Sequence, residues 1–399
     1  VSSHSCSFSN STSSSSTSCM PIVGFSCYND LQGSLAWMQD LVQTYNSPNL
    51  QVTRIDIGDS FLKTRDVTKG YDIYALKITG NSTASSNITK STMMVTSGMH
   101  PREYAPPELL QRWATQLVQA YGVDADTTAI LDHAEIHLVI QVNPDGRALA
   151  ETTQPTRRKN LNEANAQSCP KDQTGVDLNR NFPFQWGRTS GSSSNKCAQT
   201  YRGSAAASEP ETQAIVNYAL SIFPTSQRQT VSPISAYPAE TTSGVFIDVH
   251  AAGELIIWPW GYQEAKSPNH LDLQALVNKY IHFNGYASSG PDDAFGSVAS
   301  AGVTFELGYA RRQDCNYFEN SILPGNLQAL TYAAKVSSKP YSLPKGPDIA
   351  SMIVSQEQVV NLPGAFVTVT LAVSDQTFAA SQALESAQQT VALVRIHVD

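Results

Sequence analysis

The sequence lacks long hydrophobic runs and has little charge. No apolar stretch approaches the about 18 residues that a membrane-spanning helix needs, so we expect no membrane span. Charged residues make up only 15% of the chain, the net charge is −8, and the longest Lys/Arg cluster is the three residues 157–159. This composition argues against nucleic acid as a partner. Hydrophobic residues make up 41% of the 399, as in a globular protein.

Closely spaced cysteine pairs are also missing. None of the six cysteines belongs to a C-x-x-C pair of the zinc or redox type; they are Cys6, Cys19, Cys27, Cys169, Cys197 and Cys315. Disulfides fit better, and we expect a secreted, extracellular protein. Cys169 and Cys197 flank a polar loop and form the favoured bridge, and Cys6 with Cys19 is a second candidate. The pairing of the other cysteines stays open.

An initiator methionine and a signal peptide are absent from the start of the sequence, which we interpret as a processed or recombinant start. Residues 1–29 form a Ser/Thr-rich arm, and residues 30–342 alternate strand-like and helical runs, the pattern of an α/β domain. Residues 343–399 predict a small all-β module that is too small to be stable alone. In the α/β domain, strands are predicted at 71–79, 92–98, 135–142, 245–250, 254–258 and 302–307, and helices at 107–121, 209–223, 269–283 and 320–336.

A histidine and a glutamate, His100 and Glu103, lie where an apolar strand-like run ends and a helical pattern begins. Pro101 disfavours helical backbone at His100, and Pro106 and Pro107 fit only a helix start, so the pair caps a strand-to-helix turn. In an open α/β sheet, ligands bind at the carboxyl ends of the strands. Since a catalytic zinc needs about three protein ligands and one open position, the pair is a candidate for part of a metal site.

The third ligand has three candidates, His133, His137 and His250. His133 and His137 would share one face of a single strand, and the structural interpretation, a polar start of that strand, is favoured for them. His250 ends the buried-looking strand 245–250, again at a carboxyl end. His250 is therefore the better candidate.

Other polar residues stand out beside these. Glu306 lies inside an apolar strand-like run, where a lone carboxylate is costly and tends to be paired or functional. Asn179, Arg180 and Arg158 lie in a long irregular region, 143–205, although exposed arginines are usually only solvated surface. Together with the histidines, these residues suggest a metal, a carboxylate base and guanidinium groups that bind anions.

Five segments between about residues 70 and 336 resemble segments of the zinc metallocarboxypeptidases of the carboxypeptidase A and B type, and they follow one another in the same order. These segments are SGMHPREYAPPE, GVDLNRNF, YRGSAAASEPET, IDVHAAGELIIWPWG and TFELG. The resemblance implies an α/β fold with a mixed, mostly parallel eight-stranded sheet and helices on both faces. It also implies one Zn²⁺ per chain and the C-termini of peptides or proteins as substrates, and we expect a monomer.

The resemblance further implies a role for each polar residue. His100, Glu103 and His250 would bind zinc. Glu306 would act as the general base, and Arg158 would stabilise the oxyanion of the tetrahedral intermediate.

Substrate recognition is implied in the same way. Arg180, with Asn179 beside it, would bind the terminal carboxylate of the substrate through a bidentate fork. The family's lid tyrosine falls in a stretch that looks several residues short here, with Tyr286 as the nearest candidate. Asp292 would lie at the floor of the pocket for the terminal side chain, which predicts a preference for terminal Lys or Arg.

Two alternatives stay open. Related zinc folds remove acyl groups from acylamino acids, so an amidohydrolase with non-peptide substrates is one. The other is an inactive scaffold that binds peptides without cleaving them. The presence of all three candidate ligands and of Glu306 argues against the inactive scaffold.

Overall fold

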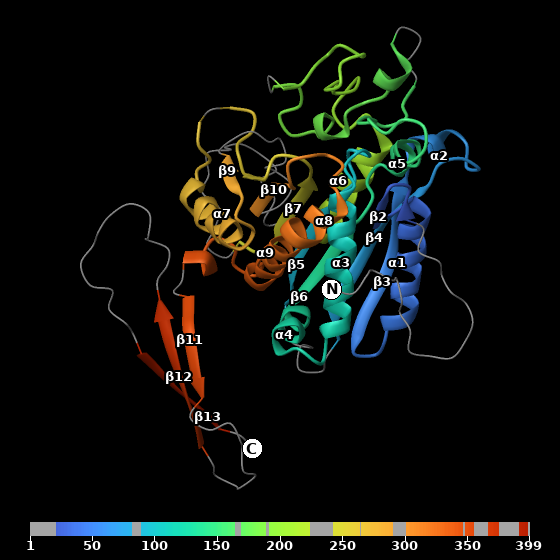
Figure 1. Ribbon diagram of the computed structural model, residues 1–399. Helices are drawn as coiled ribbons and strands as arrows, with labels where there is room; N and C mark the ends of the chain where they lie inside the picture. The colour runs from blue at the N-terminus through green and yellow to red at the C-terminus, as the bar shows by residue number, and fades with distance from the viewer. Residues whose placement is uncertain are drawn as a thin grey trace.

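An eight-stranded sheet forms the centre of the protein, with strand order β3-β4-β6-β5-β7-β10-β8-β9 (Figure 1). The strands are β3 (Leu50–Asp59), β4 (Asp72–Gly80), β5 (Ser91–Thr96), β6 (Ala134–Val139), β7 (Val245–His250), β8 (Leu255–Ile257), β9 (Ala287–Ser289) and β10 (Ala301–Glu306). Parallel pairings join β6, β5, β7 and β10 in the centre and β8 to β9 at one edge. The other pairings are antiparallel. The mixed eight-stranded sheet is the one that the resemblance implied.

The computed structural model describes residues 21–81, 89–163, 169–188, 191–223, 242–263, 265–289 and 301–345, and the strands at 348–354, 366–374 and 391–397. Asp292 and the candidate bridge between Cys6 and Cys19 lie outside these residues. The described part of the chain contains no helix whose length and hydropathy would suit a membrane span.

Apolar side chains on both faces of the sheet pack against helices. On β5, Met93 and Val95 belong to one hydrophobic cluster and Met94 to another, because successive side chains of a strand point to opposite faces. The first cluster includes residues of α1 (Leu31–Tyr45), α3 (Ala105–Ala120), α7 (His270–Asn284) and α9 (Leu323–Val336), and the second includes residues of α6 (Pro210–Ile222). Burial on both faces explains why β5 carries apolar side chains at successive positions, from Met93 to Val95.

The short helices are α2 (Phe61–Arg65), α4 (Ala125–His133), α5 (Pro144–Ala150) and α8 (Cys315–Tyr317). The expectation that His133 and His137 share one face of a strand is wrong, because His133 is the last residue of α4. His133 is exposed, with Nδ1 2.8 Å from the carbonyl oxygen of Ala129. His137 is buried on β6, with Nδ1 2.7 Å from the hydroxyl of Tyr218. Neither histidine belongs to the group of described residues that could hold a metal ion, which is His100, Glu103 and His250.

Two disulfides join distant parts of the described chain. Cys169 pairs with Cys197, the bridge that the sequence favoured, and closes part of the long irregular region. Cys27 pairs with Cys315, which the sequence had left open. This second bridge links β2 (Phe25–Asn29), which pairs with β1 (Pro21–Ile22), to α8 near the carboxyl end of β10.

Three further strands lie at the C-terminal end of the chain, β11 (Asp348–Val354), β12 (Phe366–Ser374) and β13 (Val391–His397). They pair in sequence order as an antiparallel sheet. That residues 343–399 form a separate module stays a prediction.

Candidate metal centre

The strand order places the candidate residues together at the carboxyl ends of the central strands. His100 and Glu103 lie between β5 and α3, and His250 is the last residue of β7, which pairs in parallel with β5. Glu306 is the last residue of β10 and lies opposite His250 in the parallel register. Gly98, with φ of 67°, lets the chain turn sharply after β5, and a Cβ there would lie 2.7 Å from the Gln141 side chain. The carboxyl ends of three neighbouring strands therefore bring these side chains together.

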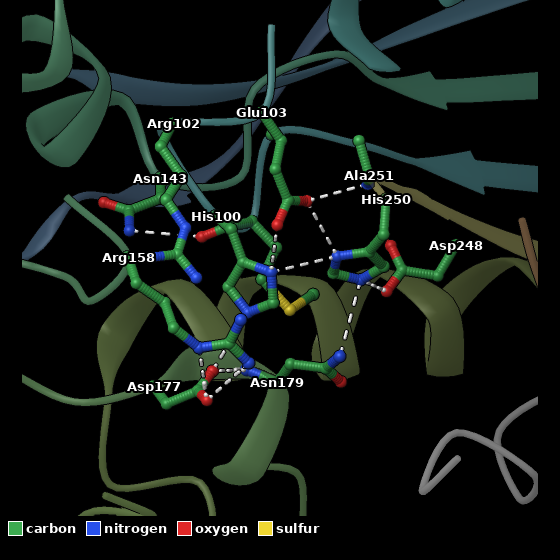
Figure 2. Close-up of polar contacts among 12 residues, drawn as sticks. His100, Arg102, Glu103, Asn143, Arg158, Asp177, Asn179, Asp248, His250 and Ala251 are labelled. Carbon is green, nitrogen blue, oxygen red and sulfur yellow. Dashed lines mark hydrogen bonds and ion pairs between the residues drawn. The ribbon is translucent and has the colours of Figure 1, made fainter. Parts of the chain in front are cut away.

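His100, Glu103 and His250 converge in a buried cluster (Figure 2). The Nδ1 atoms of His100 and His250 are 3.1 Å apart, and the Glu103 oxygens lie 3.0 Å from His100 Nδ1 and 3.2 Å from His250 Nδ1. All three side chains are at most 3% exposed. With zinc–nitrogen bonds of about 2.0–2.1 Å, tetrahedral ligands are separated by roughly 3.3 Å, so the cluster fits a zinc ion. Among the described residues, no other group of His, Cys, Asp or Glu side chains converges in this way.

The outer ring nitrogens of both histidines face carboxylates. His100 Nε2 is 3.1 Å from Asp177 Oδ1, and His250 Nε2 contacts Asp248 Oδ2. The other oxygen of Asp248 accepts a hydrogen bond of 2.6 Å from the Thr96 hydroxyl. Each carboxylate favours the tautomer that carries its proton on Nε2, which leaves the Nδ1 lone pair free for a metal.

The charges of this cluster are mutually stabilised. Burial raises the pKa of Glu103, but the charges and hydrogen bonds of His100 and His250 outweigh it and hold that pKa well below its usual range. Burial likewise raises the pKa of Asp177, yet the Arg158 guanidinium and His100 bring it below its usual range. Burial lowers the pKa of His250, but Asp248 and Glu103 together raise it by more, so the net shift is upward. Glu103 and Asp177 are therefore ionised at neutral pH, and their charges suit a cation.

Arg158 lies beside the cluster. Its Nε and Nη2 donate to Asp177 Oδ2 at 3.0 and 2.8 Å, and 14% of its side chain is exposed. Burial lowers the pKa of Arg158, but the carboxylates of Asp177, Glu103 and Glu306 raise it above its usual value. Arg158 and the half-buried Glu306 thus face the same site from different segments of the chain.

Asn179 and Arg180 belong to a 3₁₀ helix, Leu178–Arg180, directly after Asp177. Asn179 is buried, with Nδ2 3.5 Å from His250 Nε2, and its Oδ1 has no hydrogen-bond partner among the described residues. Arg180 donates to the carbonyl oxygens of Gly191 and Asn179, at 3.0 and 3.1 Å. The structure therefore brings both residues to the edge of the candidate metal centre.

Tyr286 does not have the placement expected of a lid. It is 7% exposed, and its hydroxyl accepts hydrogen bonds from Asn326 Nδ2 at 3.0 Å and from the Gly308 N–H at 3.3 Å. A side chain packed in the core with two donors on its oxygen is fixed in place. The interpretation of Tyr286 as a mobile lid is therefore wrong for this structure.

Sequence reasoning missed two carboxylates of the site. Asp248 lies in the apolar strand β7 and is fully buried, so it carries the signal that singled out Glu306, a charge inside an apolar run. Asp177 lies two residues before Asn179 in an irregular segment, where an acid is common and carries no such signal.

Comparison with known proteins gives consistent matches. A family model described as zinc carboxypeptidase (Peptidase_M14) matches residues 34–336. Carboxypeptidase B of Bos taurus is 30% identical over 298 residues, which is 70% of this chain and 63% of that protein. Carboxypeptidase A1 of Rattus norvegicus is 29% identical over 257 residues, which is 64% of this chain and 52% of that protein. The chain thus spans between about half and two thirds of the length of these relatives.

Solved structures share the fold. Thrombin activatable fibrinolysis inhibitor matches with a TM-score of 0.63 at 22% identity, over 78% of this chain and 75% of that chain. Carboxypeptidase A from Helicoverpa armigera matches with a TM-score of 0.60 at 21% identity, over 78% of this chain and 74% of that chain.

Proposed function

Since the chain belongs to the zinc carboxypeptidase family, we propose that it hydrolyses the C-terminal peptide bond of peptides and proteins. His100, Glu103 and His250 would hold one zinc ion. The observation that carries the proposal is the buried convergence of two Nδ1 atoms and one carboxylate within 3.0–3.2 Å of one another. Glu306 and Arg158 lie beside this cluster, as the chemistry requires.

The proposed mechanism divides the work among the side chains. When bound, zinc supplies polarisation of the scissile carbonyl and lowers the pKa of a water molecule. Glu306, at the carboxyl end of β10 opposite His250, takes the proton of the attacking water and passes it to the leaving amine. Arg158 donates to the oxyanion that forms on the scissile carbonyl. Asp177 holds the Arg158 guanidinium through two contacts, so this donor is oriented before substrate binds.

Arg180 and Asn179 would select the free terminal carboxylate of the substrate. Nη1 of Arg180 donates a hydrogen bond to the carbonyl oxygen of Asn179, which holds the guanidinium close to the 3₁₀ helix that contains both residues. The unpartnered Oδ1 and the amide of Asn179 are polar atoms at the same edge. A bidentate bond from Arg180 to a carboxylate would fix the last peptide bond over the candidate metal centre.

The decisive experiment combines metal analysis with release of the terminal residue from a peptide. A zinc carboxypeptidase contains about one zinc per chain and cleaves a peptide acid but not the matching C-terminal amide. Cleavage of acylamino acids in place of peptides would favour the amidohydrolase alternative. Tight binding of peptides without cleavage, at full zinc content, would favour the inactive scaffold.

Two finer properties are also proposed. The preference for terminal Lys or Arg rests on the sequence position of Asp292, and the relative named carboxypeptidase B is consistent with it. The two disulfides of the described chain support an oxidising, extracellular location.

A further inference from the structure

The two basic residues that flank Arg158 are buried and bind a different part of the chain. Arg158 itself contacts Asp177, which lies beside His100 (Figure 2). Arg157 and Lys159 are each 1% exposed, and both donate to main-chain carbonyl oxygens of the long irregular region. Two buried cations therefore hold the chain immediately before and after the proposed oxyanion donor.

The Lys159 ammonium lies among three carbonyl oxygens. Its Nζ donates to the carbonyl oxygens of Gln173 at 2.6 Å, Lys196 at 2.9 Å and Ala198 at 3.0 Å. These carbonyls come from both ends of the segment that the disulfide between Cys169 and Cys197 closes. Because an ammonium group has three donors, one side chain joins the two ends of this segment at a single point.

The residues next to Arg158 also fix it relative to the segment that carries Asp177. The N–H of Asn160 donates to the Val176 carbonyl, and Asn160 Oδ1 accepts from the Val176 N–H, both at 2.9 Å. Arg157 Nε donates to the carbonyl oxygen of Lys159 at 3.0 Å. Arg158 and Asp177 therefore belong to two segments whose relative position is set by the residues beside them.

Neither flanking cation is neutralised by a carboxylate. In the part of the chain that the structure describes, no acidic side chain forms an ion pair with Arg157 or Lys159. Burial first, and then the charge of Arg157, lower the pKa of Lys159 to about 8, against the opposing charge of Asp177. A buried ammonium beside a buried guanidinium costs free energy relative to an apolar side chain of similar size. Stability alone therefore gives no reason for a cation at position 159.

We infer that Lys159 is a positioning residue, which holds the main chain at Arg158 so that the Arg158 guanidinium meets the oxyanion in the right place. The inference rests on the proposed function, because it takes Arg158 as the donor to that oxyanion. The contact between Arg158 and Asp177 orients the guanidinium only if the segments that carry them keep a fixed separation. The charge-assisted bonds of Lys159 maintain that separation.

Lys159→Met tests the inference, because it removes the ammonium and keeps an unbranched side chain of similar length. We expect kcat to fall about 10- to 100-fold, with KM changed less than about threefold, since a misplaced donor acts on the transition state. The zinc content should stay at about one per chain. The loss of kcat should not exceed that of Arg158→Ala, because Lys159 acts through Arg158. Steady-state kinetics with a peptide acid and metal analysis measure these quantities.

A double-mutant cycle separates positioning from a general structural role. Lys159→Met added to Arg158→Ala should leave kcat within about twofold of Arg158→Ala alone, because the donor that Lys159 positions is already missing. A side chain that only stabilises the fold would lower kcat by the same factor in both backgrounds.

Lys90→Met is the matched control. Lys90 Nζ also donates to three oxygen atoms, which are the Thr79 hydroxyl at 2.8 Å, the Leu131 carbonyl at 3.1 Å and the Gly80 carbonyl. Lys90 directly precedes β5, and the candidate ligands follow the other end of that strand. Lys90→Met should lower the thermal midpoint but keep kcat within about twofold of the wild-type value.

A wild-type kcat in Lys159→Met, or effects that multiply in the double variant, would overturn the inference. If Lys159→Met does not fold, Lys159→Gln takes its place in the same cycle with the same criteria, since it keeps an N–H donor. If the wild-type protein hydrolyses no peptide, the proposed function fails, and a crystal structure of Lys159→Met tests the inference separately. Arg158 displaced from Asp177 would support the inference, and Arg158 still 2.8–3.0 Å from Asp177 Oδ2 would refute it.

Discussion

The Nδ1 atoms of His100 and His250 lie 3.1 Å apart although 150 positions of the chain separate the two residues. Two bare ring nitrogens at this distance repel each other unless a proton or a metal ion lies between them. The neighbouring carboxylate of Glu103 completes a site for a divalent cation. The ligand roles proposed for these three residues can therefore be tested separately from the role proposed for Glu306.

His250→Ala should lose most of the bound zinc, whereas Glu306→Gln should retain it and lose hydrolysis. The reason is that the ligands hold the ion, while the base acts only on the attacking water. Metal analysis of both purified variants, with peptide hydrolysis measured in parallel, checks this. Full zinc content in His250→Ala would remove His250 from the site.

Asp248→Asn should weaken zinc binding by about 10- to 100-fold, because the contact between Asp248 and His250 Nε2 orients the ring and raises its basicity. Competition with a chelator of known affinity measures this change. Thr96→Val is the matched control, since it removes only the hydrogen bond to the other oxygen of Asp248. A zinc affinity of Asp248→Asn equal to that of the wild-type protein would contradict the assignment.

Arg180→Ala should mainly raise KM and abolish the preference for a peptide acid over its C-terminal amide, because Arg180 meets a charge that is already present in the substrate. Arg158→Ala should mainly lower kcat, because the oxyanion forms only during the reaction. Steady-state kinetics of both variants with the acid and the amide distinguish the roles. If the wild-type protein cleaves acid and amide equally, the role of Arg180 is refuted.

The wild-type protein should release terminal Lys or Arg faster than Phe, because a carboxylate at the pocket floor attracts a cation and resists an apolar group. The effect is about 1 to 3 kcal/mol. Rates for matched peptides that end in Arg, Lys, Leu and Phe measure the preference, and Asp292→Ile should reverse it. An unchanged ratio in Asp292→Ile would show that Asp292 does not set specificity.

Stability should fall as the pH rises from about 4.5 to about 8, with Glu211 as one cause. Burial raises the pKa of Glu211 to about 8, and its carboxyl accepts bonds from the Phe61 N–H at 2.8 Å and from Asn160 Nδ2 at 3.0 Å. Because the pKa is higher in the folded state, this contribution is fully present below the unfolded pKa and is lost as the pH rises through about 8.

The measurement is the thermal midpoint across that pH range. In the wild-type protein, the free energy of unfolding can fall by about 1.4 kcal/mol per pH unit from this group alone, and the thermal midpoint should fall with it. Glu211→Gln should flatten the dependence of the thermal midpoint on pH. Parallel curves for the two proteins would show that Glu211 does not titrate in this range.

Local patterns determined several parts of the structure. The predicted helices at 107–121, 209–223 and 269–283 correspond closely to α3, α6 and α7, because prolines and glycines mark their ends and one apolar face repeats along each. The turn that carries His100 and Glu103 follows from its prolines. By contrast, α1 and β3 were not among the predicted elements, and β3 is an edge strand whose pattern of buried residues is irregular.

Only the tertiary structure decided which segments meet. The sequence singled out His250 by its place at a strand end, but the parallel pairing of β5, β7 and β10 puts it beside His100 and Glu306. The sequence could not pair Cys27 with Cys315, or predict that Tyr286 would be buried against Asn326. Periodicity in the sequence indicates which face of a helix or strand is buried, but the order of strands in the sheet determines which loops meet at the ends of the strands.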